Sequence, residues 1–198
     1  MYGVVFEEMI FLNFKRKIRV IIRLLLGLLS ANIPSIFLPY IDRSRLNATL
    51  DLTRERNMVY GYSFRYISAE FGEYLIHTEQ KLAPFVRFPS GKDIRVLWEW
   101  SRFEHIGTDQ VEEFFTTEYV FLRKNCKIGF GPLYISGLET SLRLVNLLLL
   151  YGKKEQPEVS IETHIYRLFF WTYFNVENRE KKYKGNHYLI TKIALFMA

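Results

Sequence analysis

The 198-residue sequence contains one cysteine, Cys126, and a single thiol cannot form an internal disulfide bond. It has no CxxC pair and no His-x-x-x-His spacing, and its four histidines are scattered along the chain. The sequence therefore predicts no metal site. It also lacks a P-loop, a GxGxxG fingerprint and a GxSxG motif. These absences remove the usual sequence signals for a nucleotide cofactor or a serine nucleophile, so we expect no cofactor.

The N-terminal region has no apolar run long enough to span a membrane. A basic cluster at residues 15–19 precedes apolar residues, but Arg23 leaves only Leu24–Leu29 unbroken, whereas a spanning helix needs about 20 residues. Two interpretations remain for residues 1–40. One is a signal peptide cleaved near Ser30–Ala31, which predicts a periplasmic or secreted protein. The other is a basic amphipathic helix over residues 14–29 that covers the domain or contacts a membrane surface, and it predicts a cytoplasmic or membrane-surface protein.

The rest of the composition fits one domain, residues 41–198, with a hydrophobic core. Hydrophobic residues make up 49% of the chain, which also has 17 Phe, 13 Tyr and 3 Trp. Such aromatic content suits a large core or a surface that stacks on sugars. The net charge of +6 favours an anionic partner, namely nucleic acid, an anionic membrane or an acidic polysaccharide. Because no nucleic-acid-binding motif is present, we expect no nucleic-acid partner.

The apolar pattern predicts a mainly α fold. Aromatic residues alternate with other residues in YGYSFRYIS, which predicts a small β element near residues 60–66. Helices are expected over residues 93–106, 109–124 and 158–173, and another from residue 186 onward. The spacing in SGKD, residues 90–93, is that of a capping box before the first of these helices.

A further helix, between Gly131 and Tyr151, is apolar on two sides. One face carries Ile135, Leu138, Leu142, Val145 and Leu149, and the other carries Leu144, Leu147, Leu148 and Tyr151. A helix that is apolar all round is buried all round. The sequence thus predicts antiparallel helices in at least two layers.

Three segments resemble the heparinase II/III family of polysaccharide lyases. GKDIRVLWEWSRFEHI (residues 91–106) resembles the family's W-E-x-x-R-F segment, GPLYISGLETSLRLVN (131–146) its S-x-L-E-x-x-x-R helix, and GNHYLI (185–190) its N-H-x-L segment. Their order and spacing also resemble the family, over about residues 60–198. The resemblance implies an incomplete α/α toroid and β-elimination on uronic-acid polysaccharides, with an acidic polysaccharide as partner.

The resemblance gives Asn186 and His187 a catalytic role. β-Elimination removes the C5 proton beside a carboxylate, which hydrogen-bond donors must first neutralise. Asn186 can donate to that carboxylate, and His187 can share this task or act as the base. The N-terminus of the expected helix adds favourable electrostatics for an anion. The alternative is that Asn186 caps the helix and that His187 is structural.

Five more residues are candidates for substrate binding. Tyr134 is assigned to the groove, because the family often has an aromatic residue just before this helix. Trp98 and Arg102 share one helix face, where they either contact a sugar acid or belong to the core and its rim. Glu139 and Arg143 are four residues apart and can pair on one helix. In so apolar a helix they either line the groove or tie neighbouring helices together.

The chain also departs from the family pattern. Leu133-Tyr134 replaces a common Asn-Trp pair, and Thr191 replaces an acidic or amide residue. The family's catalytic tyrosine and β-sandwich domain follow the N-H segment. We therefore expect this chain to be an N-terminal part of such a lyase and to be inactive alone. The alternative is a non-catalytic helical protein that binds an anionic membrane or polysaccharide through its basic N-terminal helix.

Overall fold

The structure is a computed structural model. It describes Ile18, residues 21–23 and 25–29, Ile41, residues 62–175 and residues 185–197. These residues form helices and connecting loops, with no strand among them. Their only strand-like feature is an isolated antiparallel bridge between Leu82 and Phe130. The prediction of a mainly α fold is confirmed.

The β element predicted near residues 60–66 is wrong for the residues that the structure describes. Helix α3 spans Phe64–Thr78, and the Oγ of Ser63 caps it by accepting a hydrogen bond from the Tyr66 N–H at 3.3 Å. The alternating aromatic residues therefore cross the start of a helix. The part of the expected element before residue 62 lies outside the described residues. The helix buries Ile67, Phe71 and Leu75, which recur every four residues as one helical face.

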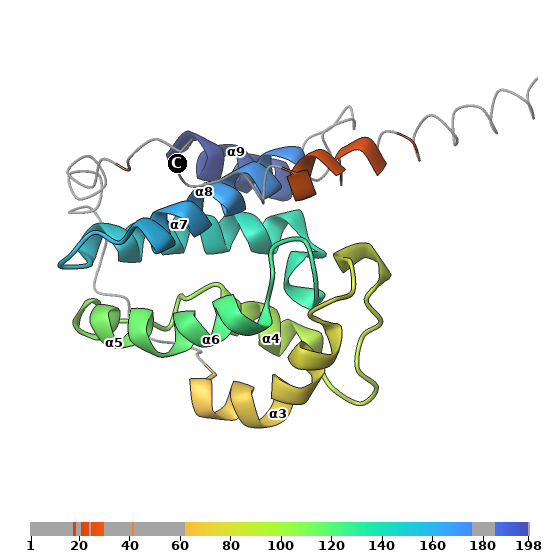
Figure 1. Ribbon diagram of the computed structural model, residues 1–198, viewed down its shortest axis with the longest axis horizontal. Helices are drawn as coiled ribbons and strands as arrows, with labels where there is room; N and C mark the ends of the chain where they lie inside the picture. The colour runs from red at the N-terminus through yellow and green to blue at the C-terminus, as the bar shows by residue number, and fades with distance from the viewer. Residues whose placement is uncertain are drawn as a thin grey trace, which may run out of the picture.

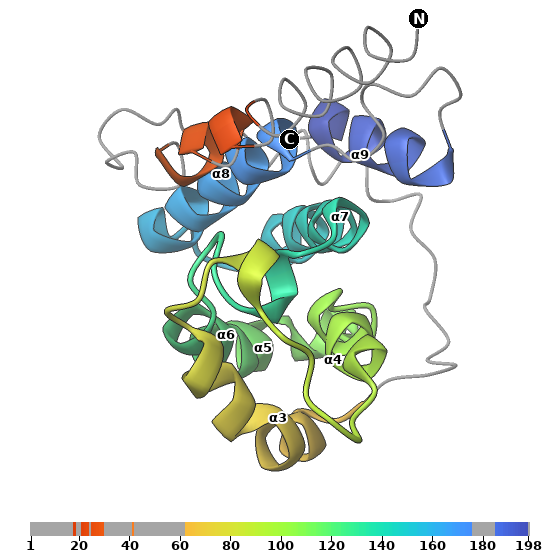
Figure 2. The ribbon, with the colours of Figure 1, turned by 90° about the vertical axis from the view of Figure 1, so that its right-hand side faces the viewer.

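The remaining helices stack in layers. They are α4 (Ile94–Ser101), α5 (Val111–Thr116), α6 (Glu118–Asn125), α7 (Gly137–Lys153), α8 (Val159–Phe174) and α9 (Asn186–Met197). Short 3₁₀ helices connect some of them: η2 (Ala83–Phe85), η3 (Thr108–Gln110) and η4 (Pro132–Tyr134). Figure 2 shows α3 at one side of the molecule, then α4, α5 and α6, then α7, and finally α8 and α9. Helix α7 is thus enclosed between two layers.

Burial along α7 is complete on one of the two apolar faces expected from the sequence. Its leucines at 144, 147 and 148 are essentially inaccessible, and so is Tyr151. Polar residues of the same helix are buried as well, including Glu139 and Arg143. The prediction of a helix covered on two sides is confirmed in part, because the other expected face, at Leu138, Leu142, Val145 and Leu149, is half-buried. Helix α7 begins at Gly137, where the Ser136 side chain caps it, and not at Gly131.

Two helix boundaries differ from expectation. Helix α4 is capped by the Asp93 carboxylate, which accepts a hydrogen bond from the Arg95 N–H at 3.0 Å, so Ser90 is not the cap. The single helix expected over residues 109–124 is divided into η3, α5 and α6. The division between α5 and α6 falls at Thr117, whose φ of −116° and ψ of −84° leave the helical region.

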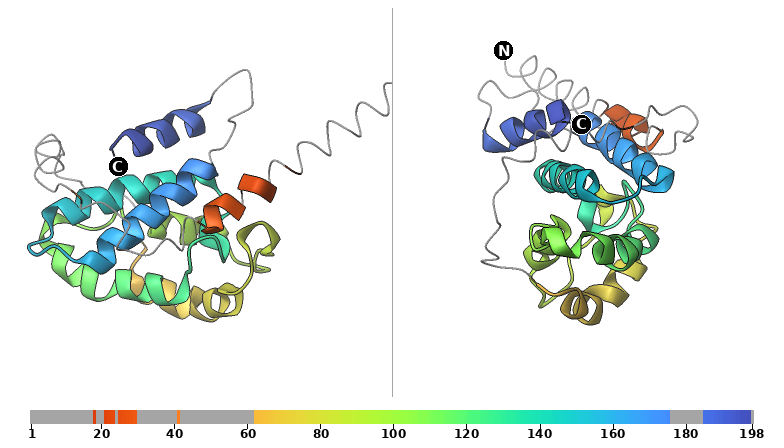
Figure 3. Two further views of the ribbon diagram at one scale, coloured as in Figure 1. Left: turned by 45° about the horizontal axis from the view of Figure 1, so that its top comes forward. Right: turned by 90° about the vertical axis from the view of Figure 1, so that its left-hand side faces the viewer.

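Helices α7, α8 and α9 form the upper part of the fold in Figure 1. Helix α8 runs back along α7, and α9 then runs in the same direction as α7 (Figures 1 and 3). The Ser141 hydroxyl on α7 donates a hydrogen bond of 2.9 Å to the Thr191 hydroxyl on α9. Because each residue lies about one turn into its helix, the first turns of α7 and α9 are at the same end of the pair.

The described residues near the N-terminus are helical and pack on the end of α8. A Cβ atom built on Gly27 would lie 3.0 Å from the Trp171 ring and 2.8 Å from the Asn175 amide, so only glycine fits this contact. No helix in the described part of the chain is long and apolar enough to cross a membrane. The basic cluster at residues 15–17, Arg19 and the Ser30–Ala31 site lie outside the described residues.

Candidate functional site

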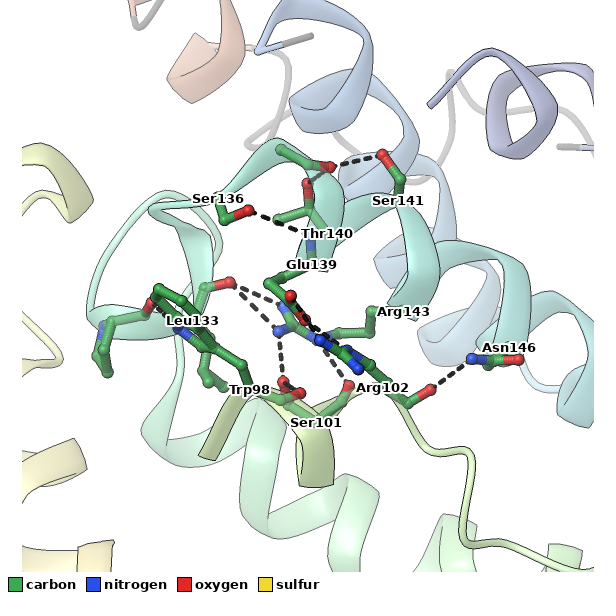
Figure 4. A network of polar contacts seen from close by, with 12 residues as sticks. Trp98, Ser101, Arg102, Leu133, Ser136, Glu139, Thr140, Ser141, Arg143 and Asn146 are labelled. Atoms are coloured by element: carbon green, nitrogen blue, oxygen red, sulfur yellow. Dashed lines mark hydrogen bonds and ion pairs between the residues drawn. The ribbon is translucent and has the colours of Figure 1, made fainter. Parts of the chain in front are cut away.

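The polar residues singled out on α4 and α7 form one network, drawn in Figure 4. Arg102 donates two parallel hydrogen bonds to Glu139, from Nε to Oε2 at 2.7 Å and from Nη2 to Oε1 at 2.8 Å. The side chain of Glu139 is 5% exposed and that of Arg102 24% exposed. The hydrogen bond to the carboxylate raises the pKa of Arg102. The two helices are therefore joined by a bidentate ion pair, which is the strong form of this interaction.

Arg143 does not pair with Glu139 as its i, i+4 spacing suggested. Its guanidinium is fully buried and donates to the Ser101 carbonyl at 2.9 Å, to the Ser101 hydroxyl at 2.7 Å and to the Leu133 carbonyl at 3.2 Å. It also lies 5.2 Å from the centroid of the Tyr134 ring. Burial lowers the pKa of Arg143. A buried cation is held here by neutral acceptors and an aromatic face.

Tyr134 and Trp98 are packed beside this network, and each donates a hydrogen bond to a backbone carbonyl. Tyr134 is only 3% exposed and donates a hydrogen bond to the Cys126 carbonyl at 3.3 Å, so the structure places it in the core and not on a groove. Burial raises its pKa. Trp98 is half-buried, and its indole N–H donates to the Pro132 carbonyl at 3.0 Å.

The network acts mainly between elements of the fold. It connects α4, η4 and α7, and the amide of Asn146 extends it by donating to the Arg102 carbonyl at 2.8 Å. Of the two interpretations of Glu139 and Arg143, the contacts match the one in which they tie neighbouring helices together. Arg102 is the network member whose charged group is partly accessible.

His187 lies apart from this network, in the exposed first turn of α9. The Gly185 carbonyl accepts hydrogen bonds from the N–H groups of Tyr188 and Leu189, so Asn186 is the first helical residue and Gly185 precedes the helix. Thr191, the residue that departs from the family pattern, donates to the His187 carbonyl at 2.8 Å and accepts from Ser141. Its hydroxyl therefore fixes α9 on α7.

A first cavity was not predicted from the sequence. It has a volume of about 370 Å³ between the start of α3 and the loop before α5, with Tyr62 and Gln110 among its lining residues. Within it, Glu118 accepts hydrogen bonds from the Trp100 indole at 2.8 Å and from His105 Nε2 at 3.0 Å. This His–carboxylate pair joins residues that share no motif, so only the fold brings them together.

A second cavity, of about 310 Å³, lies between α6 and α8 and is strongly basic. Its lining residues are Arg123, Lys124, Cys126, Lys127, Ile128, Ser160, His164 and Arg167. The cations come from two segments about forty residues apart, and no single helix carries them all. The only sign of this cluster of cations in the sequence is the basic run RKNCK at residues 123–127.

Cys126 and the acidic residues give no metal centre in the described part of the chain. No three His, Cys, Asp or Glu side chains lie close enough together there to hold a metal ion. Cys126 is buried, and burial raises its thiol pKa to about 12, so it is not a reactive thiolate.

Comparison with known proteins gave no relative. No family model, no curated protein and no solved structure matches the chain.

Proposed function

We propose that the chain is the helical, uronide-binding part of a polysaccharide lyase of the heparinase II/III type, with an incomplete α/α toroid. The observation that carries the proposal is the resemblance of three segments in the same order. The helical fold is consistent with it, because each of these segments contributes a helix: α4, α7 and α9.

The proposed site lies at the common end of α7 and α9. Asn186 and His187 begin α9, whose N-terminal N–H groups favour an anion, and the exposed imidazole of His187 can reach a ligand. In the proposal they neutralise the uronate carboxylate, and His187 or a group nearby takes the C5 proton. In the proposal, the partly exposed Arg102, held by Glu139, adds a cation for the uronate, and Tyr134, Trp98 and Arg143 support it from the core.

Binding of an unsulfated uronide tests this proposal directly. Calorimetric titration with an alginate oligosaccharide is expected to show weak binding that His187→Ala abolishes. His77, exposed in the last turn of α3, provides a matched control, and His77→Ala is expected to leave binding unchanged. Equal affinity of the wild-type protein and His187→Ala would contradict the assignment of α9.

A second candidate function rests on a different surface. Among the described residues 21–23 and 25–29, five large apolar side chains are exposed: Ile21 (54%), Ile22 (49%), Leu25 (52%), Leu26 (41%) and Leu29 (70%). A helix with such a face, next to a basic cluster in the sequence, suits the interface of an anionic membrane. Co-sedimentation with anionic vesicles, but not with neutral ones, is expected, and Leu25→Glu with Leu29→Glu should abolish it. Equal co-sedimentation of that double variant would exclude this function.

A further inference from the structure

The basic cavity between α6 and α8 has the features of an anion site. Four of its eight lining residues are cationic, namely Arg123, Lys124, Lys127 and Arg167, and none of the eight is acidic. Like charges brought together around one cavity repel each other, and this repulsion is relieved when an anion occupies it. A bound anion would therefore reduce the repulsion among these four cations.

Neighbouring contacts hold part of this charge in place. Arg123 donates from Nη1 to the Ser160 hydroxyl at 2.9 Å, and its guanidinium lies 5.7 Å from the centroid of the Tyr119 ring. Ser160 in turn donates to the Glu158 carboxylate. The Lys127 ammonium lies 5.1 Å from the centroid of the Phe130 ring. These contacts position two of the four cations at the edge of the cavity before any ligand binds.

His164 lines the cavity and carries a buried nitrogen, Nε2, that has essentially no accessible surface. The residue is nine-tenths buried, and its Nε2 has no hydrogen-bond partner among the described residues. Burial, together with the charges of Arg123, Arg143 and Arg167, lowers the pKa of His164 to about 3, so the ring is neutral near neutral pH. A neutral imidazole can carry its proton on Nε2 and donate it to a bound oxygen. Buried nitrogens normally have a partner, which the described residues do not supply to Nε2.

We propose that this cavity binds a phosphate monoester group. Near neutral pH such a group carries close to two negative charges and presents three strong acceptor oxygens. Guanidinium groups bind phosphate through paired hydrogen bonds, and lysines add point charges. A cavity of about 310 Å³ is at the small end of the range for ligand pockets, which suits a phosphate with a short substituent.

The surroundings suggest two sources for that group. Along α8, His164 and Arg167 are followed one turn later by Trp171, on which Gly27 packs, and a Cβ on Gly129 would lie 2.7 Å from Leu28. Gly27 and Leu28, which lie in the same segment as the exposed residues Leu25, Leu26 and Leu29, therefore pack beside the elements that line the cavity. The phosphate belongs either to a soluble molecule or to the head group of a lipid beneath that segment. The proposal uses no residue of the uronide site at the start of α9, so the two can fail independently.

Titration with a soluble monoester tests the cavity. Glycerol phosphate is expected to bind in a calorimetric titration at constant ionic strength, whereas glycerol is not. Lys127→Gln with Arg167→Gln should weaken binding about tenfold or more, because two charged hydrogen bonds are lost. Lys81→Gln, at an exposed lysine outside the cavity, is the matched control and should bind normally. Equal affinity of the double variant, or no binding by the wild-type protein, would overturn the proposal.

Two further measurements complete the test. The His164 ring resonances in the NMR spectrum should shift on addition of glycerol phosphate, and this measurement needs no substitution. If the protein binds glycerol phosphate but these resonances do not shift, the ligand lies elsewhere and the proposal is refuted. Vesicles of phosphatidic acid, a monoester, and of phosphatidylglycerol, a diester, separate the two sources. If the protein binds phosphatidic acid vesicles preferentially and the double variant loses this preference, the ligand is a lipid head group. If the protein binds both kinds of vesicle equally but binds glycerol phosphate in the cavity, the ligand is a soluble molecule.

Discussion

Arg102, which follows the last residue of α4, and Glu139 of α7 lie thirty-seven residues apart in the chain and form a bidentate ion pair at 2.7 and 2.8 Å. The carboxylate is almost completely buried, whereas the guanidinium remains partly exposed. A buried carboxylate needs its partner, because burial without one carries a full desolvation penalty. The pair therefore acts chiefly to hold α4 against α7, and any role in binding uses only the exposed side of Arg102.

Loss of Arg102 should destabilise the fold. Arg102→Ala leaves the Glu139 carboxylate buried without its cation, and we expect a loss of about 2–3 kcal/mol in the free energy of unfolding, measured by urea denaturation. Arg95 forms an exposed pair with Asp93, and Arg95→Ala is the control, for which no measurable change is expected. If both variants had the wild-type stability, the pair would not be a structural connection.

Arg143 should be more sensitive than Arg102. Arg143→Ala removes a fully buried side chain and leaves the Ser101 and Leu133 carbonyls without a donor, so we expect a loss of about 3–5 kcal/mol. Arg143→Lys keeps the charge but cannot reproduce the planar set of donors, and its loss should be smaller. Arg65, exposed on α3, is the control. Similar denaturation midpoints for Arg143→Ala and Arg65→Ala would contradict this account.

Periodicity in the sequence predicted the long helices, because α7 and α8 are apolar enough for their pattern to dominate. It failed at Tyr62–Tyr66, where aromatic alternation over a few residues resembled a strand. The helical face of α3 can be recognised in the sequence only when the four-residue spacing of Ile67, Phe71 and Leu75, which follow the aromatic stretch, is considered as well. The partners of Arg143 could not be predicted at all, since two of them are backbone carbonyls, whose positions depend on the fold and not on residue type.

The basic cavity was missed for a related reason. Its cations come from the end of α6, the following loop and α8, and each segment alone is an ordinary amphipathic or solvated stretch. The N-H segment, in contrast, could be placed correctly from the sequence, because α9 begins at Asn186 as the pattern suggested. The Ser141–Thr191 hydrogen bond links α9 to α7, and the identity of Thr191 alone does not predict this partner.

The stability of the protein should fall in mild acid because of His164. Its folded pKa of about 3 lies below the value of about 6.5 for an unfolded histidine. The contribution of His164 to the free energy of unfolding is therefore complete above about pH 6.5. It is lost as the pH falls toward 3, because the unfolded chain binds a proton that the folded chain does not. Between about pH 7 and about pH 5 we expect the free energy of unfolding, measured by urea denaturation, to fall by about 2 kcal/mol.

A variant without the titrating ring is the control for this pH effect. His164→Phe keeps the edge-on ring contact with Tyr119, whose centroid is 5.5 Å away, and removes the titration. The variant should show a flatter pH dependence than the wild-type protein over the same range. Parallel pH profiles for the two proteins would mean that His164 titrates normally in the folded state.

The contact between α7 and α9 should depend on one hydroxyl pair. Thr191→Val keeps the shape of a fully buried side chain and removes the hydrogen bond between the two helices, while the Ser141 hydroxyl keeps the Gly137 carbonyl as an acceptor within α7. We expect a loss of about 1 kcal/mol and faster amide hydrogen exchange confined to α9. Thr163, an exposed-face threonine on α8 whose hydroxyl bonds within its own helix, provides the control Thr163→Val. Unchanged exchange in α9 would show that apolar packing alone fixes this helix.

The purified 198-residue chain should bind uronide chains without cleaving them. Elimination needs a base for the C5 proton and an acid for the leaving oxygen, and each typically contributes about 10²–10⁴-fold to the rate. In the family that the chain resembles, a tyrosine after the N-H segment supplies this chemistry, whereas no tyrosine follows Tyr188 here. Incubation with heparan sulfate or alginate is therefore expected to give no rise in the absorbance of the unsaturated product.

Adding the downstream part of a heparinase II/III lyase in a fusion should restore turnover, and His187→Ala in that fusion should abolish it. Full elimination by the 198 residues alone would show that the catalytic roles belong to other residues, with the His105–Glu118 pair as the first to examine.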